Sequence, residues 1–443
     1  MRKRFCVKTL AFGLAYWLVP AIYILIPAGL HSQWKNPPQK KVLKNGLTVI
    51  TQKDEVSTVT VIEILIKGGK RSEPAGKKGL SYLTTRLSLE IPDQGKVQEL
   101  MENSSHYSMT TKGDYSVIHL ECLTDNLEPM LKVFVKILKK PLFSGIRIDR
   151  IKDYMDDERK IENDSNINTG HLTHLETLLK DLGYSGSIYG ESESLKNIKG
   201  RDIEAYCEKY FVAQNMILAA VSDLEPDKLL PILNKFFSSF PSVKTEEPAF
   251  PDSQPANVSE PRETILEKDT KQALVSLGYR LPKISPRNRA LAGLLENLLG
   301  KGPGSRLWRL RTEKKLAYNV ICQVTLMKES GILEAYLETE SVKKDAAREE
   351  LKIILRELYD KGVAADELQD AKALVKANFL RSNETKDRRT ETLASFEALG
   401  LGLEFLWKYF QELDSVTPKD INAFIKEFLN PDKSALVIVG PKN

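Results

Sequence analysis

The feature that most constrains the fold is a repeat: the second half of the chain presents the same kinds of segment, in the same order, as the first. Each half has an apolar strand-like run, a strand followed by an amphipathic helix, a long helix, and a helix followed by a closing apolar strand. The matching segments are 60–69 with 273–282, 115–138 with 331–355, 148–165 with 365–382, and 202–223 with 420–441. Their separations of 213 to 218 residues, kept through four matches, indicate an internal duplication.

Residues 241–262 separate the two copies; they contain five prolines and show no apolar periodicity, which is typical of a linker. We therefore predict two homologous domains, 39–240 and 263–443, and the length of 443 residues suits two domains. Strands that often follow one another directly, mixed with long amphipathic helices, predict an α+β fold. Each domain is expected to have an antiparallel-rich sheet with helices packed on one face. Two unrelated α+β domains are the alternative.

Residues 1–32 have the character of a targeting segment. The basic start MRKRFCVK precedes 22 uncharged, apolar residues at 9–30. This length can span a bilayer, whereas the prolines and small residues near its end favour cleavage, so we predict either a signal peptide or a membrane anchor. In both cases the basic end stays inside and the remainder is exported. The prediction is a periplasmic protein, or one anchored in the inner membrane and facing the periplasm.

Composition argues against two classes of protein. The net charge is +5, but the first eight residues supply four of these charges, and no basic stripe of the kind that nucleic-acid binding needs is found elsewhere. Cys122, Cys207 and Cys322 are widely spaced and form neither a disulfide framework nor a metal-binding pair. We predict them to be small buried apolar residues.

The segment 44–83, KNGLTVITQKDEVSTVTVIEILIKGGKRSEPAGKKGLSYL, resembles the start of the pitrilysin/insulinase-like zinc peptidases, the inverzincins. In that family a similar segment leads into a helix that carries the sequence H-x-x-E-H. Two further segments resemble the family, NIKGRDIEAYCEKYFVAQNMILAAVSD at 197–223 and GKGPGSRLWRLRTEKKLAYNV at 300–320. The resemblance covers the chain from about residue 40 to the end.

The resemblance implies that the zinc site is lost. The two histidines and the general-base glutamate of H-x-x-E-H correspond to Tyr82, Arg86 and Thr85, and the acidic ligand from a later helix corresponds to Asp156. Thr85 cannot take a proton from water, and Arg86 cannot bind a cation. We expect no zinc on this helix and no cofactor in this chain. Because a buried guanidinium needs an anionic partner, we predict a salt bridge from Arg86 to Asp156 or Asp157.

The segment 300–320 keeps the family pattern. By resemblance, Arg311 and Tyr318 correspond to an Arg and a Tyr that reach across to a zinc site and bind the substrate. Arginine offers a fork of donors to a carbonyl, and a tyrosine hydroxyl can donate to a developing oxyanion. An ordinary surface arginine and a half-buried tyrosine are the alternative. Lys315 stands where many members have glycine, so the turn is expected to differ.

The remaining histidines offer weaker candidates. His171 and His174 are spaced to share one helix face, with Glu176 nearby, and could bind a metal. A solvent-exposed helix face is the interpretation that we favour, because short histidine pairs are common there. His106 and His119 lie in strand-like runs and are predicted to be packing or surface residues.

These observations predict a non-catalytic subunit of an exported, heterodimeric zinc peptidase. Its partner would be a homologous chain with an intact H-x-x-E-H that holds the zinc, and this chain would supply Arg311 and Tyr318 for hydrolysis of a peptide. A structural or peptide-binding homologue without a catalytic partner is the alternative. An active peptidase with another metal site is disfavoured, because the expected ligands are absent from the sequence.

Overall fold

The computed structural model describes residues 36–91, 93–102, 105–139, 141, 143–243 and 262–442. The predicted targeting segment 1–32 and almost all of the predicted linker 241–262 lie outside the described residues. Among the described residues, no helix combines the length and the apolar character that crossing a bilayer requires.

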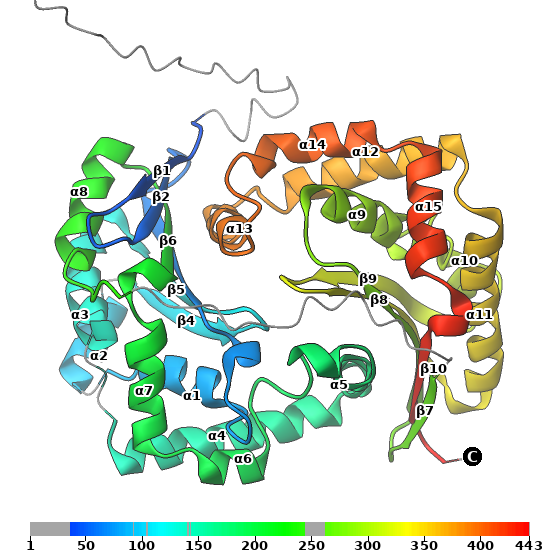
Figure 1. Cartoon of the computed structure of the whole chain (residues 1–443), viewed down its shortest axis with the longest axis horizontal. Coiled ribbons are helices and arrows are strands. Elements are labelled where there is room, and N and C mark those ends of the chain that lie inside the picture. The colour runs from blue at the N-terminus through cyan, green and yellow to red at the C-terminus, as the bar shows by residue number, and fades with distance from the viewer. Residues whose placement is uncertain are drawn as a thin grey trace, which may run out of the picture.

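Two sheets, one from each half, form the framework (Figure 1). The strand order is β1-β2-β6-β3-β5-β4 in the first sheet and β7-β11-β8-β10-β9 in the second. The first sheet contains β1 (Gln39–Val42), β2 (Thr48–Lys53), β3 (Val59–Lys67), β4 (His106–Thr111), β5 (Tyr115–Leu123) and β6 (Met216–Ser222). The second contains β7 (Arg262–Glu267), β8 (Gln272–Leu281), β9 (Ala317–Leu326), β10 (Gly331–Glu340) and β11 (Ala435–Gly440).

Apart from β1, the two strand orders correspond position by position. A parallel pair occurs at the same place in each sheet, β2 with β6 and β7 with β11. The other strand pairs of the described residues are antiparallel, such as β3 with β5 and β8 with β10. The predicted α+β fold with two homologous, antiparallel-rich domains is therefore confirmed, and so is the duplication.

The helices repeat in the same way. The first half has α1 (Leu80–Leu87), α2 (Gln94–Glu102), α3 (Leu127–Lys139), α4 (Gly145–Asp164), α5 (Asn166–Leu179), α6 (Ser192–Asn197), α7 (Gly200–Tyr210) and α8 (Pro226–Phe237). The second has α9 (Pro286–Gly300), α10 (Trp308–Thr312), α11 (Lys344–Lys361), α12 (Ala365–Arg381), α13 (Lys386–Ala398), α14 (Phe405–Ser415) and α15 (Pro418–Phe428). Helices α3, α4 and α7 occupy the same places in the order as α11, α12 and α15.

The two halves exchange one helix each. Helix α5 packs on β8 and β11 of the second sheet, and α13 packs on β3 and β6 of the first. Figure 1 shows both helices between the sheets. Helices of each half therefore cover one face of their own sheet, and a helix of the other half covers the opposite face. The sequence of β3, VTVIEILIK, suits this arrangement, because a strand buried on both faces has a continuous apolar run.

Alternate residues of β3 contribute to different cores. Ile62 and Ile64 belong to the core of the first half, whereas Leu65 belongs to a cluster that also contains Leu393 and Phe396 of α13. Since successive side chains of a strand point to opposite faces, Glu63 shares the face of Leu65. A charged residue thus lies in the apolar contact between the halves.

Candidate functional site

Helix α1 corresponds to the metal-binding helix of the resembled family, and a glycine and a carboxylate fix the conformation of its N-terminus. Gly79 precedes it with φ 93°, and a β-carbon there would lie 3.0 Å from the carbonyl oxygen of Tyr189, so glycine is required. Glu73 accepts the Gly79 N–H at Oε2 and the Ser81 N–H at Oε1, both at 2.9 Å. Burial raises the pKa of Glu73 to about 7, although these hydrogen bonds favour its ionised form.

Tyr82 and Thr85 fill the first half's core and do not face an open site. The Tyr82 side chain is 6% exposed, and its ring packs edge-on against Tyr189 with 4.9 Å between the ring centres. Burial raises the pKa of Tyr82, which keeps its phenol neutral. Thr85 is fully buried, and its hydroxyl donates to the carbonyl oxygen of Ser81 at 2.8 Å. Both side chains are therefore engaged within the protein.

The predicted salt bridge between Arg86 and Asp156 or Asp157 is wrong. Arg86 Nη1 lies 3.2 Å from Glu90 Oε1, four residues further along and beyond the end of α1 at Leu87. Asp156 Oδ1 lies 2.6 Å from Arg159 Nη2 and accepts the hydroxyl of Ser192 at 2.9 Å. The Arg86 side chain is 34% exposed, so it needs no buried counter-ion. Arg86 and Asp156 thus both pair with residues close to them in sequence. Asp157 does the same, because it pairs with Lys160.

These four residues do not fit a zinc ion, although α1 still packs against α4. Zinc is bound by thiolate, imidazole and carboxylate groups. The corresponding positions here hold a neutral phenol, a hydroxyl that is bonded to its own helix, a guanidinium, and a carboxylate that is paired with Arg159. A cation bound among them would face the positive charge of Arg86. The region is a packed contact between two helices.

Arg311 and Tyr318 lie elsewhere, on α10 and on the edge strand β9, far from α1 (Figure 1). The Arg311 guanidinium carbon lies 4.6 Å from the ring centre of Trp308 and 4.3 Å from that of Tyr318. Both distances are within the range of a cation–π contact. Trp308 packs on the core of the second half, whereas the Tyr318 side chain is 75% exposed. Arg311 thus contacts both an anchored ring and an exposed one.

The turn before Tyr318 keeps a conformation that suits glycine. Among the described residues, Lys315 alone of the non-glycine residues has a positive φ, 51°. A side chain in this left-handed region costs roughly 1–2 kcal/mol. The replacement of the family's glycine by Lys315 has therefore not moved the backbone out of the region that glycine favours.

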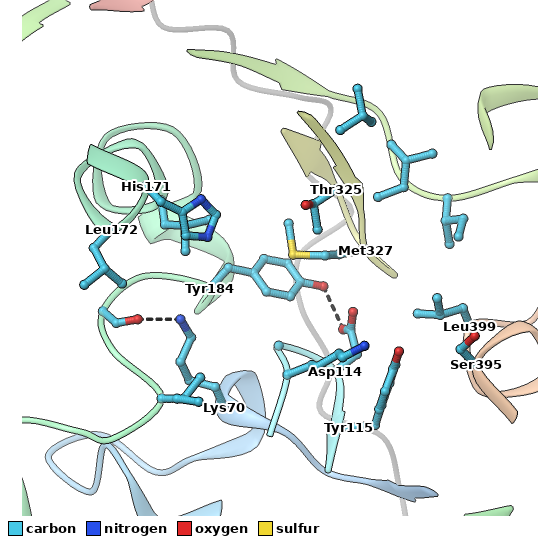
Figure 2. A pocket seen from close by; sticks show the side chains of 18 of the residues that line it. Lys70, Asp114, Tyr115, His171, Leu172, Tyr184, Thr325, Met327, Ser395 and Leu399 are labelled. Carbon is cyan, nitrogen blue, oxygen red and sulfur yellow. Dashed lines mark hydrogen bonds between the residues drawn. The ribbon is translucent and has the colours of Figure 1, made fainter. Parts of the chain in front are cut away.

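A cavity of about 470 Å³ lies between the two halves (Figure 2). Its walls mix apolar and polar side chains from both halves, among them Lys70, Asp114, Tyr115, His171, Leu172 and Tyr184 from the first and Thr325, Met327, Ser395 and Leu399 from the second. Most of these residues could not be identified from the sequence, because the cavity exists only where the two halves meet. It is large enough to take a small, partly apolar group.

Asp114 ties the cavity walls together. It accepts the Tyr184 hydroxyl at 2.7 Å and the Lys328 N–H at 3.0 Å, and it pairs with Arg71 at 2.9 Å. Lys70 donates to the carbonyl oxygen of Gly186 at 2.6 Å, and burial lowers its pKa to about 8. These groups hold one another and give the cavity hydrogen-bonding walls.

His171 and His174 do not form a solvent-exposed face, so that interpretation is wrong. His171 Nδ1 lies 2.7 Å from Glu334 Oε2 of β10, and His174 is fully buried with its Nε2 at 2.8 Å from the Ser276 hydroxyl. A β-carbon at Gly278 would come within 2.4 Å of His174. The pair anchors α5 on the second sheet, which a sequence read one half at a time does not predict.

Comparison with known proteins follows the same division of the chain. Residues 48–185 match the family described as insulinase, peptidase family M16, and residues 197–375 match the family described as peptidase M16 inactive domain. Together the two matches cover most of the chain.

Two curated relatives come from one organism, Helicobacter pylori. The non-peptidase homolog YmxG is 26% identical over 403 residues, which are 89% of this chain and 92% of the relative. The zinc protease PqqE is 23% identical over 449 residues, which are 99% of this chain and 100% of the relative. Similar chains in one cell thus include a peptidase and a protein named as not being one.

Among solved structures, the peptidase M16 inactive domain from Pseudomonas fluorescens has the same fold, with a TM-score of 0.83 at 20% identity. The similarity covers 92% of this chain and 98% of the other.

Proposed function

The chain belongs to the insulinase family of peptidases, family M16, and we propose that it is a non-catalytic subunit that supplies Arg311 and Tyr318 to the zinc site of a homologous partner chain. The partner would carry an intact H-x-x-E-H and hold the zinc. The pair would hydrolyse short or unfolded peptides.

The observation that carries the proposal is the exposed stack of Arg311 and Tyr318. A side chain as large as Tyr318 that is 75% exposed adds little to the stability of this chain. The Arg311 guanidinium carbon nevertheless lies 4.3 Å from the ring centre of Tyr318 and 4.6 Å from that of Trp308. An exposed tyrosine in contact with a half-buried arginine is suited to a second molecule, and Tyr and Arg are among the residues most often dominant at protein interfaces.

The chemistry of these donors suits peptide hydrolysis. The partner's zinc would activate the attacking water. As the tetrahedral intermediate forms, charge develops on the substrate carbonyl oxygen, and the Tyr318 hydroxyl and the Arg311 fork could donate to it. The contrast with α1 supports this division of labour, since its donor set does not fit a metal.

The names of the relatives support the same reading. A non-peptidase homolog and a zinc protease of similar length occur together in Helicobacter pylori. We infer that the organism of this chain also has an active homologue. The character of residues 1–32 favours export, so we place the pair in the periplasm, or on the inner membrane facing it.

Co-expression tests the proposal. The full-length chain and a homologue from the same genome with an intact H-x-x-E-H should elute together on gel filtration, and the complex should cleave a short peptide that neither chain cleaves alone. A partner variant without its general-base glutamate is the control and should assemble without activity. If the chains elute apart, or if the partner alone is equally active, the structural or peptide-binding alternative is favoured.

A further inference from the structure

A second cluster of metal-binding side chains lies between the two halves, away from α1. Glu63 of β3 and His119 of β5 are directly opposite each other in the first sheet. Asp387 comes from the first turn of α13, which the second half lays across that sheet. One ligand atom from each of the three residues lies within 4.8 Å of the other two.

The distance from His119 to Asp387 suits two ligands of one ion, whereas the distance to Glu63 is that of a hydrogen bond and would lengthen on metal binding. His119 Nδ1 lies 2.9 Å from Glu63 Oε1 and 3.4 Å from Asp387 Oδ1. Two ligands of a tetrahedral zinc ion, with bonds of about 2.0–2.2 Å, lie about 3.3–3.6 Å apart. The other ring nitrogen, His119 Nε2, lies 3.8 Å from Glu121 Oε2. This distance is too long for a hydrogen bond, so Glu121 adds negative charge near the imidazole without fixing its orientation.

An unpartnered oxygen points to a missing ligand. Glu63 is 4% exposed, and its Oε2 has no hydrogen-bond partner among the residues that the structure describes. A buried polar atom without a partner costs about 1–3 kcal/mol, and more when it is charged. One imidazole cannot neutralise Glu63, Asp387 and Glu121 together, whereas a divalent cation would satisfy the free oxygen and the excess charge.

Basic residues of α13, and Lys112 between β4 and β5, are bonded to other groups. Lys386 donates to the carbonyl oxygens of Ser57 and Val59 at 2.6 and 2.7 Å. Arg388 pairs with Glu391 at 3.1 Å, and Lys112 pairs with the same carboxylate at 3.2 Å. These basic side chains are thus bonded to groups other than Glu63 and Asp387, and Arg389 of the same helix pairs with Asp54.

We propose that Glu63, His119 and Asp387 form a divalent-cation site, suited to Zn²⁺, that fastens the first sheet to α13. An imidazole with two carboxylates matches the ligand preferences of zinc, and three protein ligands leave one position for water. Asp387 has a half-exposed side chain, so an ion can enter from solvent. The site is structural and independent of the proposed function, and it revises the expectation from the sequence that this chain holds no cofactor.

Zinc uptake by the chelator-treated full-length chain tests the proposal. We expect one Zn²⁺ per chain by elemental analysis, and a higher melting temperature when Zn²⁺ is added. Asp387→Asn and His119→Gln should each weaken Zn²⁺ binding at least tenfold and remove the rise in melting temperature. Asp156→Asn, which changes the carboxylate on α4, is the matched control and should bind Zn²⁺ like the wild type.

The outcomes separate clearly. An absence of zinc binding, or an equal affinity in Asp387→Asn and His119→Gln, would overturn the proposal. Zinc that is lost in Asp156→Asn instead would place the ion between α1 and α4. Circular dichroism checks the fold of each variant; if His119→Gln does not fold, Asp387→Asn decides, because this side chain is half-exposed.

Discussion

The α1–α4 contact of the first half and the α10–β9 segment of the second half differ in where their side chains lie. At the first, Tyr82 and Thr85 are buried and Arg86 pairs with Glu90 just beyond its helix. At the second, Arg311 contacts two rings and Tyr318 is 75% exposed. One region is closed within the chain and the other is exposed to solvent.

The difference teaches which parts of a peptidase this chain can supply. In the closed region, side chains that stabilise the fold stand where the family has metal ligands. The open region presents the side chains of Arg311 and Tyr318, whose removal should change the stability of the fold little. Substitutions in the closed region should therefore lower stability. Substitutions in the open region should leave stability nearly unchanged and affect function instead.

The largest expected effect on stability is at Tyr82. Tyr82→Ala removes a buried ring and should lower the free energy of unfolding by about 3–5 kcal/mol, because a cavity is left in the core. Tyr318→Ala, the matched change at the exposed tyrosine, should change it by no more than about 0.5 kcal/mol. Denaturant unfolding of both variants measures the contrast; equal losses would remove it.

Glu73 should make the closed region sensitive to pH. Its folded pKa of about 7 exceeds the ordinary value of 4.5, so the folded chain binds the proton more tightly than the unfolded chain does. The contribution of Glu73 to the free energy of unfolding is therefore full below about pH 4.5. It is lost as the pH rises through 7, by roughly 3 kcal/mol at most.

Urea unfolding at a series of pH values checks this expectation. Glu73→Gln, which has no carboxyl to titrate, should flatten the profile between pH 4.5 and 7.5, and the same change at the exposed Glu313 beside α10 is the control. A profile that Glu73→Gln leaves unaltered would show that another group carries the pH dependence.

The smallest effect should be a gain in stability at the open region. Lys315→Gly relieves a side chain at φ 51° and should raise the free energy of unfolding by up to about 1 kcal/mol, reduced by the greater freedom of glycine in the unfolded chain. Thermal unfolding measures the shift. A clear loss of stability would mean that Lys315 makes contacts that outweigh the backbone strain.

The repeat and the family segments predicted the fold class, the order of elements and the replaced residues on α1. They carry that information because each match is local in sequence. The prediction that Arg86 pairs with Asp156 failed, since Glu90, just beyond the end of α1, and Arg159, one turn further along α4, form the pairs instead. Charges on helix surfaces find near partners easily.

Contacts between the two halves could not be predicted from the sequence. His174 and Asp387 lie on polar-looking helices, and only the exchange of α5 and α13 shows what they face. Glu63 did carry a signal, as the one charged residue inside an apolar strand. The pairing of Glu63 with His119 follows from the register of β3 with β5, and the continuous apolar run of β3 does not fix that register.

The most direct test of the proposed role is the turnover of a short peptide by the co-expressed complex with Tyr318→Phe. This change deletes one hydroxyl and keeps the ring beside Arg311, so the complex should still elute as one species. Loss of a donor to the oxyanion should lower kcat by roughly 10- to 1000-fold. Arg311→Ala should also lower kcat, with an added loss of packing on Trp308. Unchanged turnover in both variants, with the complex intact, would contradict the role of this chain as a supplier of catalytic donors.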